Sequence, residues 1–527
     1  MSLVSKAHYL KLILIIFFVS LISVFVFSNY CIAQEQGGTL TLIRSADSRF
    51  LDYGFSNVME DMNVCSTIFD TLVEYDAEGN IVPGLATSWE PSEDGKTWIF
   101  HLRNNVKFHD GSDFDANAVV VSFTRQNEDS PYYYYPGRTS SFNIYLGEVV
   151  NSVEAVDSET VKIVLNQPFS PLLNYLAMQN AAIVSPTALE KYKENFSQHP
   201  VGTGPFVFKE WERDAYIKLD ANKDYWGKVP YVDELIFRVV PDVSSRLLEL
   251  QKGTVCIVQS LNPDQTIALE GNPNVVIAKR AASAIGYFAM NVTVEPLDNV
   301  LVRKAINYAI DTQTIIDTIM EGQVTRATTA LPEWMPEHNE NIPAYPYDPE
   351  KAKELLREAG YPDGFTTELW TFAFERSYLP NAVLVAQKIQ ADLQNVGIDA
   401  KLSVLESAIY WELVNTLKHQ IAAKGWSTPP VADQLLRVAM LMEAGTGYGK
   451  TPRGQELIEK AKEAAETADE EKRIRIYKDI QQVLYEDTPV ILICHPNNIW
   501  GYNAKIHNVE IPVNNDGSLL EHVWIEK

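Results

Sequence analysis

Strand-like and helix-like patterns alternate along almost the whole chain, and this mixture limits the possible folds more than any other feature. Apolar and polar residues alternate at 39–43, 97–102 and 233–240, which predicts strands. From about residue 300 the pattern changes to amphipathic helices, with strands such as 398–404 between them. The sequence contains no internal repeat and no low-complexity tract. It therefore predicts α/β lobes rather than a solenoid.

Individual helices can be placed from the spacing of apolar residues and from capping residues. Asp115 is a suitable N-cap for a helix over 116–125, and apolar spacing predicts another helix over 64–75. The later part of the chain is predicted to hold four further helices: 302–310, 349–359, 384–396 and 457–484.

The first 33 residues have the plan of a secretory signal peptide. Lys6 and Lys11 form a basic start, an uncharged apolar run covers 12–27, and small residues favour cleavage after Ala33. The apolar run is short for a membrane span of roughly 20 residues, so we favour export to the periplasm over a retained anchor. Lipidation at Cys31 is an alternative, although Tyr30 is bulky for that processing.

Charge and composition exclude several functions. The chain has 44 basic and 69 acidic residues, a net charge of −25, which makes it a poor nucleic-acid binder. Cys65, Cys256 and Cys494 are too few for a disulfide framework, although Cys65 and Cys256 could pair. Cys494 lies in an apolar run, which predicts a buried thiol.

Motifs for catalysis or cofactor binding are weak. The run 444–451 resembles a phosphate-binding loop, but Pro452 disfavours a helix starting at Thr451, and we interpret the run as a flexible polar loop. His101 and His109 are interpreted as structural residues, and no metal or other cofactor is expected. The clearest binding signal is aromatic content near predicted loops, which favours a ligand cleft; the residues concerned are Tyr132–Tyr135, Trp334, Trp370, Phe372, Phe374, Trp411 and Trp426.

Longer motifs carry a resemblance to a known family. The most specific stretch is 98–111, Trp-Ile-Phe-His-Leu-Arg-Asn-Asn-Val-Lys-Phe-His-Asp-Gly. Further matching segments follow in order along the chain: 82–90, 94–98, 201–206, 224–226, 302–311 and 347–356. On these motifs the chain resembles the large extracytoplasmic solute-binding proteins of peptide/nickel ABC importers, solute-binding family 5.

The resemblance implies an α/β, two-lobed periplasmic-binding-protein fold (type II, cluster C) with an extra inserted subdomain. Lobe I would comprise 37–75, 201–284 and 493–527, and the inserted subdomain would comprise 76–200. Lobe II would comprise 285–492, with crossovers near 284–287 and 489–494. Ligand would bind between the lobes, which close by a hinge motion.

The resemblance also suggests ligand-binding residues. Arg376 and Tyr378 match an Arg-Pro-Tyr segment whose arginine pairs with a ligand carboxylate, and Trp426 matches a Gly-Trp motif. The aspartate that follows that motif in dipeptide-binding relatives is replaced here by Pro429, and Asp433 is out of register. A free ligand amine would therefore lack its usual partner. The loop 54–61 matches a segment that presents backbone groups to ligand; its candidates are Phe55, Ser56, Asn57, Glu60 and Asp61, the last two as replacement acids.

Together these observations predict the substrate-binding subunit of an ABC importer. It would act as a monomer, capture a small peptide or peptide-like solute, and deliver it to permease and ATPase subunits. A metal chelate, an oligosaccharide or an opine-like acid is an alternative ligand. Other classes remain open: a secreted hydrolase would need a catalytic carboxylate pair or nucleophile, and a membrane-anchored receptor would retain residues 1–33.

Overall fold

The computed structural model describes residues 36–527, apart from 57, 139, 375 and 514–516. The predicted signal peptide lies outside the described residues. Within the described part of the chain, no helix has both the length and the apolar character needed to cross a bilayer.

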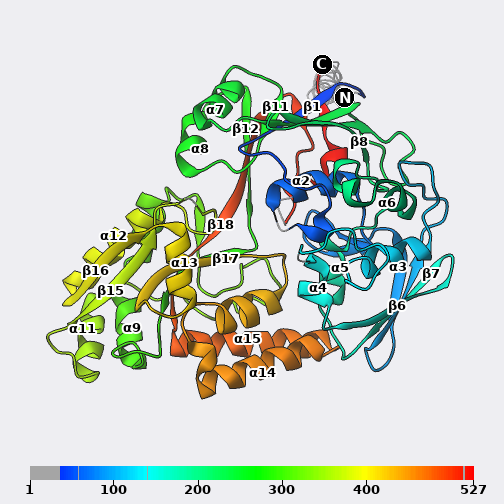
Figure 1. Ribbon diagram of the computed structural model, residues 1–527. Helices are drawn as coiled ribbons and strands as arrows, with labels where there is room; N and C mark the ends of the chain where they lie inside the picture. The colour runs from blue at the N-terminus through cyan, green and yellow to red at the C-terminus, as the bar shows by residue number, and fades with distance from the viewer. Residues whose placement is uncertain (1–35, 57, 139, 375, 514–516) are drawn as a thin grey trace, which may run out of the picture.

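A large mixed sheet runs through the molecule and organises the fold (Figure 1). Its strand order is β16-β15-β17-β13-β18-β11-β1-β10-β9-β8, and β12 and β14 also pair with β18. We call the part built on β1 and β8–β11 lobe I. Its sheet strands are β1 (Thr39–Arg44), β8 (Phe206–Glu212), β9 (Tyr216–Ala221), β10 (Glu234–Val239) and β11 (Cys256–Val258). Its helices include α2 (Met59–Ile68), α6 (Pro186–Tyr192), α7 (Val243–Gln251) and α8 (Pro263–Leu269).

Lobe II is the part built on the other end of the sheet. Alternate residues of β13 enter two separate cores, Phe288 and Met290 on one face and Tyr287 and Ala289 on the other, because successive side chains of a strand point to opposite faces. Its strands are β13 (Ala284–Met290), β14 (Val324–Arg326), β15 (Phe365–Phe372), β16 (Ile398–Leu405) and β17 (Ile421–Ser427). Its longer helices are α9 (Val300–Ala309), α11 (Pro349–Glu358), α12 (Ala382–Asn395), α13 (Ser407–Asn415), η5 (Gln434–Met442), α14 (Pro452–Glu466) and α15 (Glu470–Asp487).

Two long strands connect the lobes. The start of β18 (Val490–Asn503) pairs with β13 of lobe II, and its end pairs with β11 and with β12 (Val275–Ala281). The chain passes from β12 to β13 through only two residues. A rotation of one lobe against the other must therefore be absorbed near residues 281–284 and 494–497.

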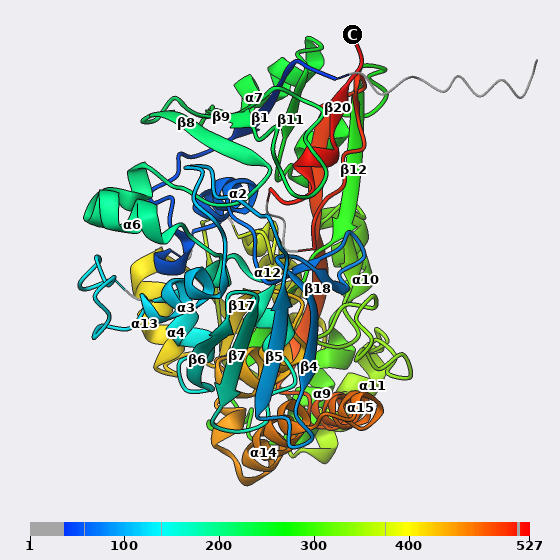
Figure 2. The same ribbon diagram turned by 90° about the vertical axis from the view of Figure 1, so that its right-hand side faces the viewer.

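A separate four-stranded antiparallel sheet lies beside lobe I (Figure 2). Its order is β4-β5-β7-β6, with β4 (Ala86–Pro91), β5 (Thr97–Leu102), β6 (Val150–Asp157) and β7 (Thr160–Leu165). The helices of this region are α3 (Ala116–Thr124), α4 (Ser141–Leu146) and α5 (Leu172–Leu176). The region also contacts lobe II, because the Ser170 backbone N–H donates to the carbonyl of Ala465 in α14 at 2.6 Å.

The smaller elements complete the chain. They are η1 (Tyr53–Phe55), β2 (Val73–Tyr75), β3 (Ile81–Pro83), η2 (Gln179–Ala181), η3 (Lys193–Gln198), α10 (Thr312–Thr314), η4 (Ile315–Ile319), η6 (Tyr448–Lys450), β19 (Ile506–His507), η7 (Leu520–His522) and β20 (Trp524–Ile525).

Most predicted elements are confirmed. The Asp115 side chain accepts from the Ala118 N–H and caps α3 as expected, and α9, α11 and α12 lie within two residues of their predicted bounds. The helix predicted over 64–75 is wrong in its second half. It ends at Ile68, whose carbonyl accepts from the Gly204 N–H at 2.9 Å, and a Cβ at Gly202 would lie 2.2 Å from that oxygen. Close packing of Gly202 and Gly204 against Ile68 thus coincides with the end of the helix.

Two further predictions need correction. The single helix predicted over 457–484 is two helices, α14 and α15, because Asp469 caps a new start by accepting from the Lys472 N–H. The run 444–451 is not a flexible polar loop, since Ala444, Thr446 and Tyr448 are buried. Its Gly449 packs against the carbonyl of Leu441, where a Cβ would lie 2.1 Å away. It follows the helix η5 rather than a strand, so the element order of a phosphate-binding loop is absent from this segment.

Candidate functional site

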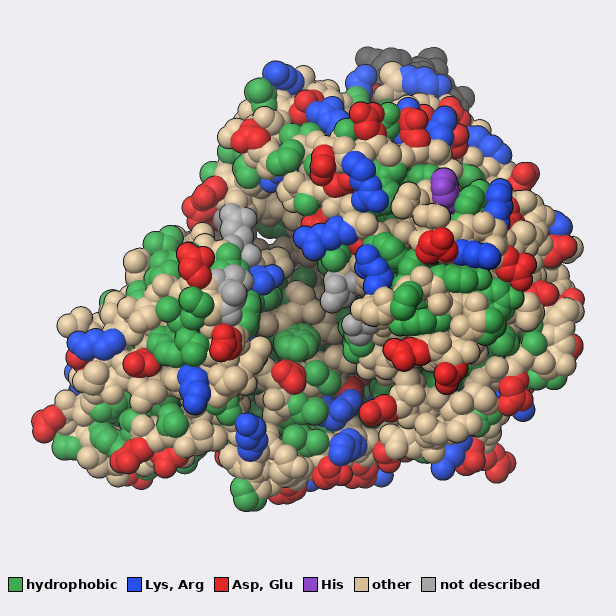
Figure 3. Space-filling view, viewed as in Figure 1, with side chains coloured by type: hydrophobic (Ala, Val, Ile, Leu, Met, Phe, Trp, Pro, Cys, Tyr) green, Lys and Arg blue, Asp and Glu red, His purple; other side chains and the backbone are tan. Residues whose placement is uncertain are grey.

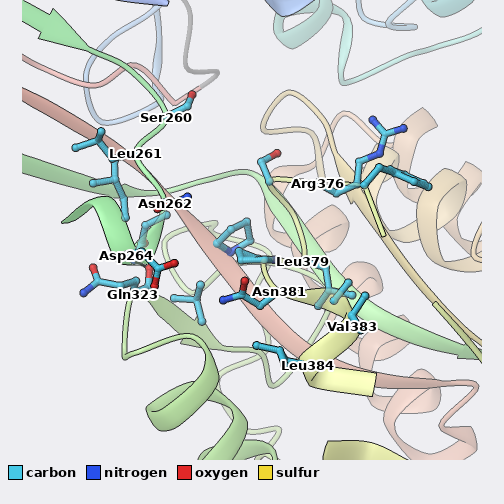
Figure 4. Close-up of a pocket in the computed structure, with 18 of the residues that line it drawn as sticks. Ser260, Leu261, Asn262, Asp264, Gln323, Arg376, Leu379, Asn381, Val383 and Leu384 are labelled. Atoms are coloured by element: carbon cyan, nitrogen blue, oxygen red, sulfur yellow. Dashed lines mark hydrogen bonds between the residues drawn. The ribbon is translucent and has the colours of Figure 1, made fainter. Parts of the chain in front are cut away.

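A deep hollow opens at the centre of the molecule, between lobe II on one side and lobe I with the four-stranded sheet on the other (Figure 3). A pocket of about 460 Å³ joins residues 260–264 of lobe I to residues 372–384 of lobe II, and Arg376 is part of its wall. Figure 4 shows Arg376 across this pocket from Ser260, Leu261 and Asn262. A second pocket, of about 580 Å³, lies between residues 144–175 and residues 426–438, and Trp426 lines it. The two side chains therefore line different pockets between the same two parts of the protein.

Arg376 is an exposed cation held on aromatic rings. Its guanidinium carbon lies 5.0 Å from the ring centroid of Phe374 and 5.7 Å from that of Trp411. No carboxylate of the described residues forms an ion pair with it. Stacking on an aromatic face orients the guanidinium while leaving its N–H groups available to an anion.

Tyr378 anchors the loop that carries Arg376. If Gly286 carried a Cβ atom, that atom would lie only 2.2 Å from the backbone carbonyl oxygen of Tyr378. A Cβ atom on Gly425 would likewise lie 2.1 Å from the Tyr378 ring. These glycines are cross-strand neighbours in β13 and β17. Burial raises the pKa of Tyr378 to about 12, so its hydroxyl stays neutral. The glycine of the Gly-Trp motif is thus explained by close packing against Tyr378.

The segment after Trp426 offers no free carboxylate. Pro429 accepts at its carbonyl from the Ser283 hydroxyl at 3.2 Å and from the Val431 N–H at 2.7 Å. The Asp433 side chain is fully buried and is paired with Arg437 at 2.5 Å. Asp433 is therefore already neutralised, which removes it as a partner for a ligand amine.

The loop 54–61 is more buried than expected from the sequence. The ring of Phe55 is 3% exposed and packs on Tyr135, with centroids 5.0 Å apart, so this side chain does not face the hollow. Ser56 is also buried and donates to Asp61 at 2.6 Å. Asp61 further accepts from the Arg49 N–H at 2.6 Å, so it is not a replacement acid for a ligand.

The remaining candidates of this loop differ in status. Asn57 lies outside the described residues. Glu60 is half-buried. Its backbone carbonyl, not its side chain, accepts hydrogen bonds from Arg44 and from the Ser48 hydroxyl, both at 2.8 Å. Glu60 is thus the candidate acid of the loop that keeps an open carboxylate.

Sequence reasoning missed the residues that hold this loop in place. Arg125 donates two hydrogen bonds to Asp52, at 2.8 and 2.7 Å, and both side chains are almost fully buried. The two residues are 73 positions apart, and no local pattern connects them. Gly286, by contrast, had a sequence signal, because a glycine inside an apolar strand often marks a close backbone approach.

The three described cysteines are buried within the fold, and His109 is half-buried. Cys65, Cys256 and Cys494 are all free and buried, which confirms the prediction for Cys494 and excludes a Cys65–Cys256 disulfide in this structure. His109 Nε2 bonds the Gly204 carbonyl at 2.9 Å, and burial lowers its pKa to about 4. Among the described residues, no group of three or more His, Cys, Asp or Glu side chains is arranged to hold a metal ion.

Comparison with known proteins shows which family has this architecture. Residues 80–443 match the model of the bacterial extracellular solute-binding proteins, family 5 Middle. The dipeptide-binding protein of Escherichia coli K12 is 35% identical over 81% of this chain and 83% of its own length. The solved structure of HbpA2 from Haemophilus parasuis is 30% identical, has a TM-score of 0.86, and is matched over 93% of this chain and 100% of its own. DppA from Helicobacter pylori, in complex with the peptide STSA, is 31% identical with a TM-score of 0.75, over 94% and 99% of the two chains.

These relatives share the two-lobed architecture seen here, and the matched region includes the inserted sheet, the connection between β12 and β13, and most of lobe II. The chain belongs to the bacterial extracellular solute-binding proteins of family 5.

Proposed function

We propose that this protein captures a short peptide or peptide-like acid in the hollow between its lobes and delivers it to the permease of an ABC importer. The observation that carries this proposal is Arg376, an exposed guanidinium on an aromatic support with no carboxylate partner among the described residues. A guanidinium in that setting suits a ligand carboxylate. The dipeptide-binding protein of Escherichia coli and the peptide complex of Helicobacter pylori DppA support a peptide over a sugar.

Ligand binding would be coupled to closure. We propose lobe I as 37–75, 201–284 and 493–527, the inserted subdomain as 76–200, and lobe II as 285–492, with hinges at the connections made by β12–β13 and β18. A ligand that contacts both lobes favours the closed state in proportion to its extra contacts there. The closed form would then dock on the permease, whose ATPase subunits supply the energy. In this proposal the exported monomer works in the periplasm and catalyses no reaction.

The end of the site near Trp426 favours a ligand without a free amine. Pro429 carries no charge, Asp433 is occupied by Arg437, and Asp61 is occupied by Ser56 and the Arg49 N–H. The carboxylates that remain are Glu148 and Glu466, which line this pocket as exposed side chains, and Glu60 of the loop 54–61. Ion pairs with exposed carboxylates are weak, whereas a buried ammonium without a close counter-charge is strongly unfavourable. We therefore expect an N-acetylated peptide to bind at least as tightly as its free-amine form.

Two experiments test the proposal. Mass spectrometry of the natively purified protein should show a bound peptide or peptide-like acid, and a sugar or a metal chelate in its place would contradict the proposal. In calorimetry with N-acetylated peptides, Arg376→Gln should cost about 1.5–3 kcal/mol of binding free energy, the scale of a charged hydrogen bond. The exposed Arg475 on α15 provides the control, because Arg475→Gln should leave affinity unchanged.

A further inference from the structure

Three arginines from three different segments gather around residues 48–50 of lobe I. Arg49 follows β1, Arg138 lies between α3 and α4, and Arg213 lies in the turn between β8 and β9. Arg213 donates to the Ser48 carbonyl at 3.4 Å, and the guanidinium of Arg138 lies 3.8 Å from the ring centroid of Phe50. We call Arg49, Arg138 and Arg213 the arginine cluster.

Among the residues that the structure describes, the cluster has no carboxylate partner in an ion pair. All three side chains are exposed, and no ion pair joins any of them to an acid among the described residues. The nearby acids are engaged elsewhere, Asp47 by Arg44 at 3.1 Å and Asp52 by Arg125. Three further carboxylates lie in the surrounding segments, Glu60, Glu212 and Asp214, and none of them forms an ion pair with an arginine of the cluster.

Two of the arginines are held in fixed orientations. Arg213 stacks on Trp211, with its guanidinium carbon 3.4 Å from the ring centroid, and Trp211 is itself fixed because its Nε1 donates to Asp47 at 3.0 Å. Arg138 stacks on Phe50, which packs on Tyr135 with centroids 4.8 Å apart. Stacking covers one face of each guanidinium and leaves the N–H edges open, which is the geometry that binds carboxylates.

The cluster lies on lobe I and the region beside it, which border the hollow opposite lobe II. Residues 48–50 lead directly into the loop 52–61, and Figure 3 shows Lys and Arg side chains along the side of the hollow where α2 and this loop lie. Arg376 belongs to lobe II, on the opposite side. A ligand with two acidic groups could therefore be held by one lobe at each end.

We propose that the arginine cluster is a subsite for a second acidic group of the ligand, a side-chain carboxylate of a peptide, in addition to the carboxylate bound by Arg376. This inference rests on the proposed function and narrows it to acidic peptides.

A matched pair of peptides tests the subsite. Acetyl-Ala-Glu and acetyl-Ala-Gln differ in one charge at nearly equal size, and calorimetry should show the wild-type protein binding the glutamate peptide at least tenfold more tightly. The triple variant Arg49→Gln/Arg138→Gln/Arg213→Gln should lose this preference while keeping its affinity for acetyl-Ala-Gln. Arg475→Gln should keep the preference. Equal affinities in the wild-type protein, or a preference that survives in the triple variant, would overturn the proposal.

Two further measurements distinguish loss of the subsite from misfolding of the variant and from failure of peptide binding. Circular dichroism and thermal unfolding identify a misfolded triple variant. In that case the single variant Arg49→Gln is used, because the Arg49 side chain is exposed and forms no ion pair with a described residue. This variant should lower the preference at least twofold, and an unchanged preference counts against the subsite. If neither peptide binds, peptide capture fails, and the cluster is tested with citrate. Citrate binding at least tenfold weaker in the variant supports an anion subsite, and equal or undetectable binding in both proteins refutes it.

Discussion

Gly286 offers a direct test of how the fold positions Arg376. A Cβ at residue 286 would lie 2.2 Å from the Tyr378 carbonyl oxygen and 3.1 Å from the Leu379 side chain, whereas ordinary contacts begin near 3.4 Å. In Gly286→Ala the segment that carries Arg376 must therefore move outward by about 1 Å, because the strand beneath it is buried and paired on both sides.

The size of the effect follows from this displacement. Overpacking of a dense core costs about 1–3 kcal/mol, so the free energy of unfolding should fall by that amount. Arg376 lies two residues before Tyr378 and should move with it, so the variant should lose part or all of the roughly 1.5–3 kcal/mol assigned to the arginine–carboxylate bond. This corresponds to a loss of affinity of up to about 150-fold.

Two measurements separate the causes. Urea unfolding gives the change in stability, and calorimetry with an N-acetylated peptide gives the change in affinity. Ile163→Val, in the fully buried core of the four-stranded sheet, is the control, since it should cost about 0.5–1.5 kcal/mol of stability and leave the affinity unchanged. Wild-type stability and affinity in Gly286→Ala would refute the packing argument.

Three further predictions follow from buried groups. Arg125→Met leaves Asp52 buried without its partner and should lower stability by about 3–5 kcal/mol, whereas the double variant Asp52→Asn/Arg125→Met should recover part of that loss in urea unfolding. Burial lowers the pKa of His419 to about 4, so on acidification His419 is protonated in the unfolded chain at a higher pH than in the folded protein. The free energy of unfolding should therefore fall as the pH drops from about 6.5 towards 4. If His419→Leu shows the same dependence of stability on pH, the dependence comes from other groups. Burial raises the pKa of Cys256 and Cys494 to about 12, so these thiols should react slowly with a thiol reagent in the folded protein. In the chain lacking residues 1–33, three thiols should react after denaturation, and a reducing agent should leave Tm unchanged.

The sequence predicted the fold class because the relevant signals are local. Periods of two and 3.6 residues mark strands and helices within a few residues, and a capping side chain such as Asp115 acts three residues away. The longer motifs added the family and the order of the lobes. Local signals failed where packing decided the boundary, because the carbonyl of Ile68 is engaged by Gly204 from a distant segment. The break in the helix predicted over 457–484 was missed although Asp469, a local capping residue, marks the new start.

The candidate site was only partly predictable for the same reason. Sequence matching proposed Arg376, Tyr378 and Trp426, since each belongs to a short motif, and Arg376 and Trp426 line pockets in the structure. It also selected Phe55 and Asp61, whose side chains are turned into the protein. Whether an acid is free or occupied depends on partners that can be distant in sequence, as Asp52 is from Arg125.

The sequence by itself thus determined the class of fold and the family and proposed one cationic anchor, because these depend on residue types and short spacings. Only the tertiary structure decided which charges remain unpaired. It brought Arg49, Arg138 and Arg213 together from three loops and placed Tyr378 on Gly286 and Gly425, because chain folding, not sequence proximity, sets the distances over which charges and packed atoms interact.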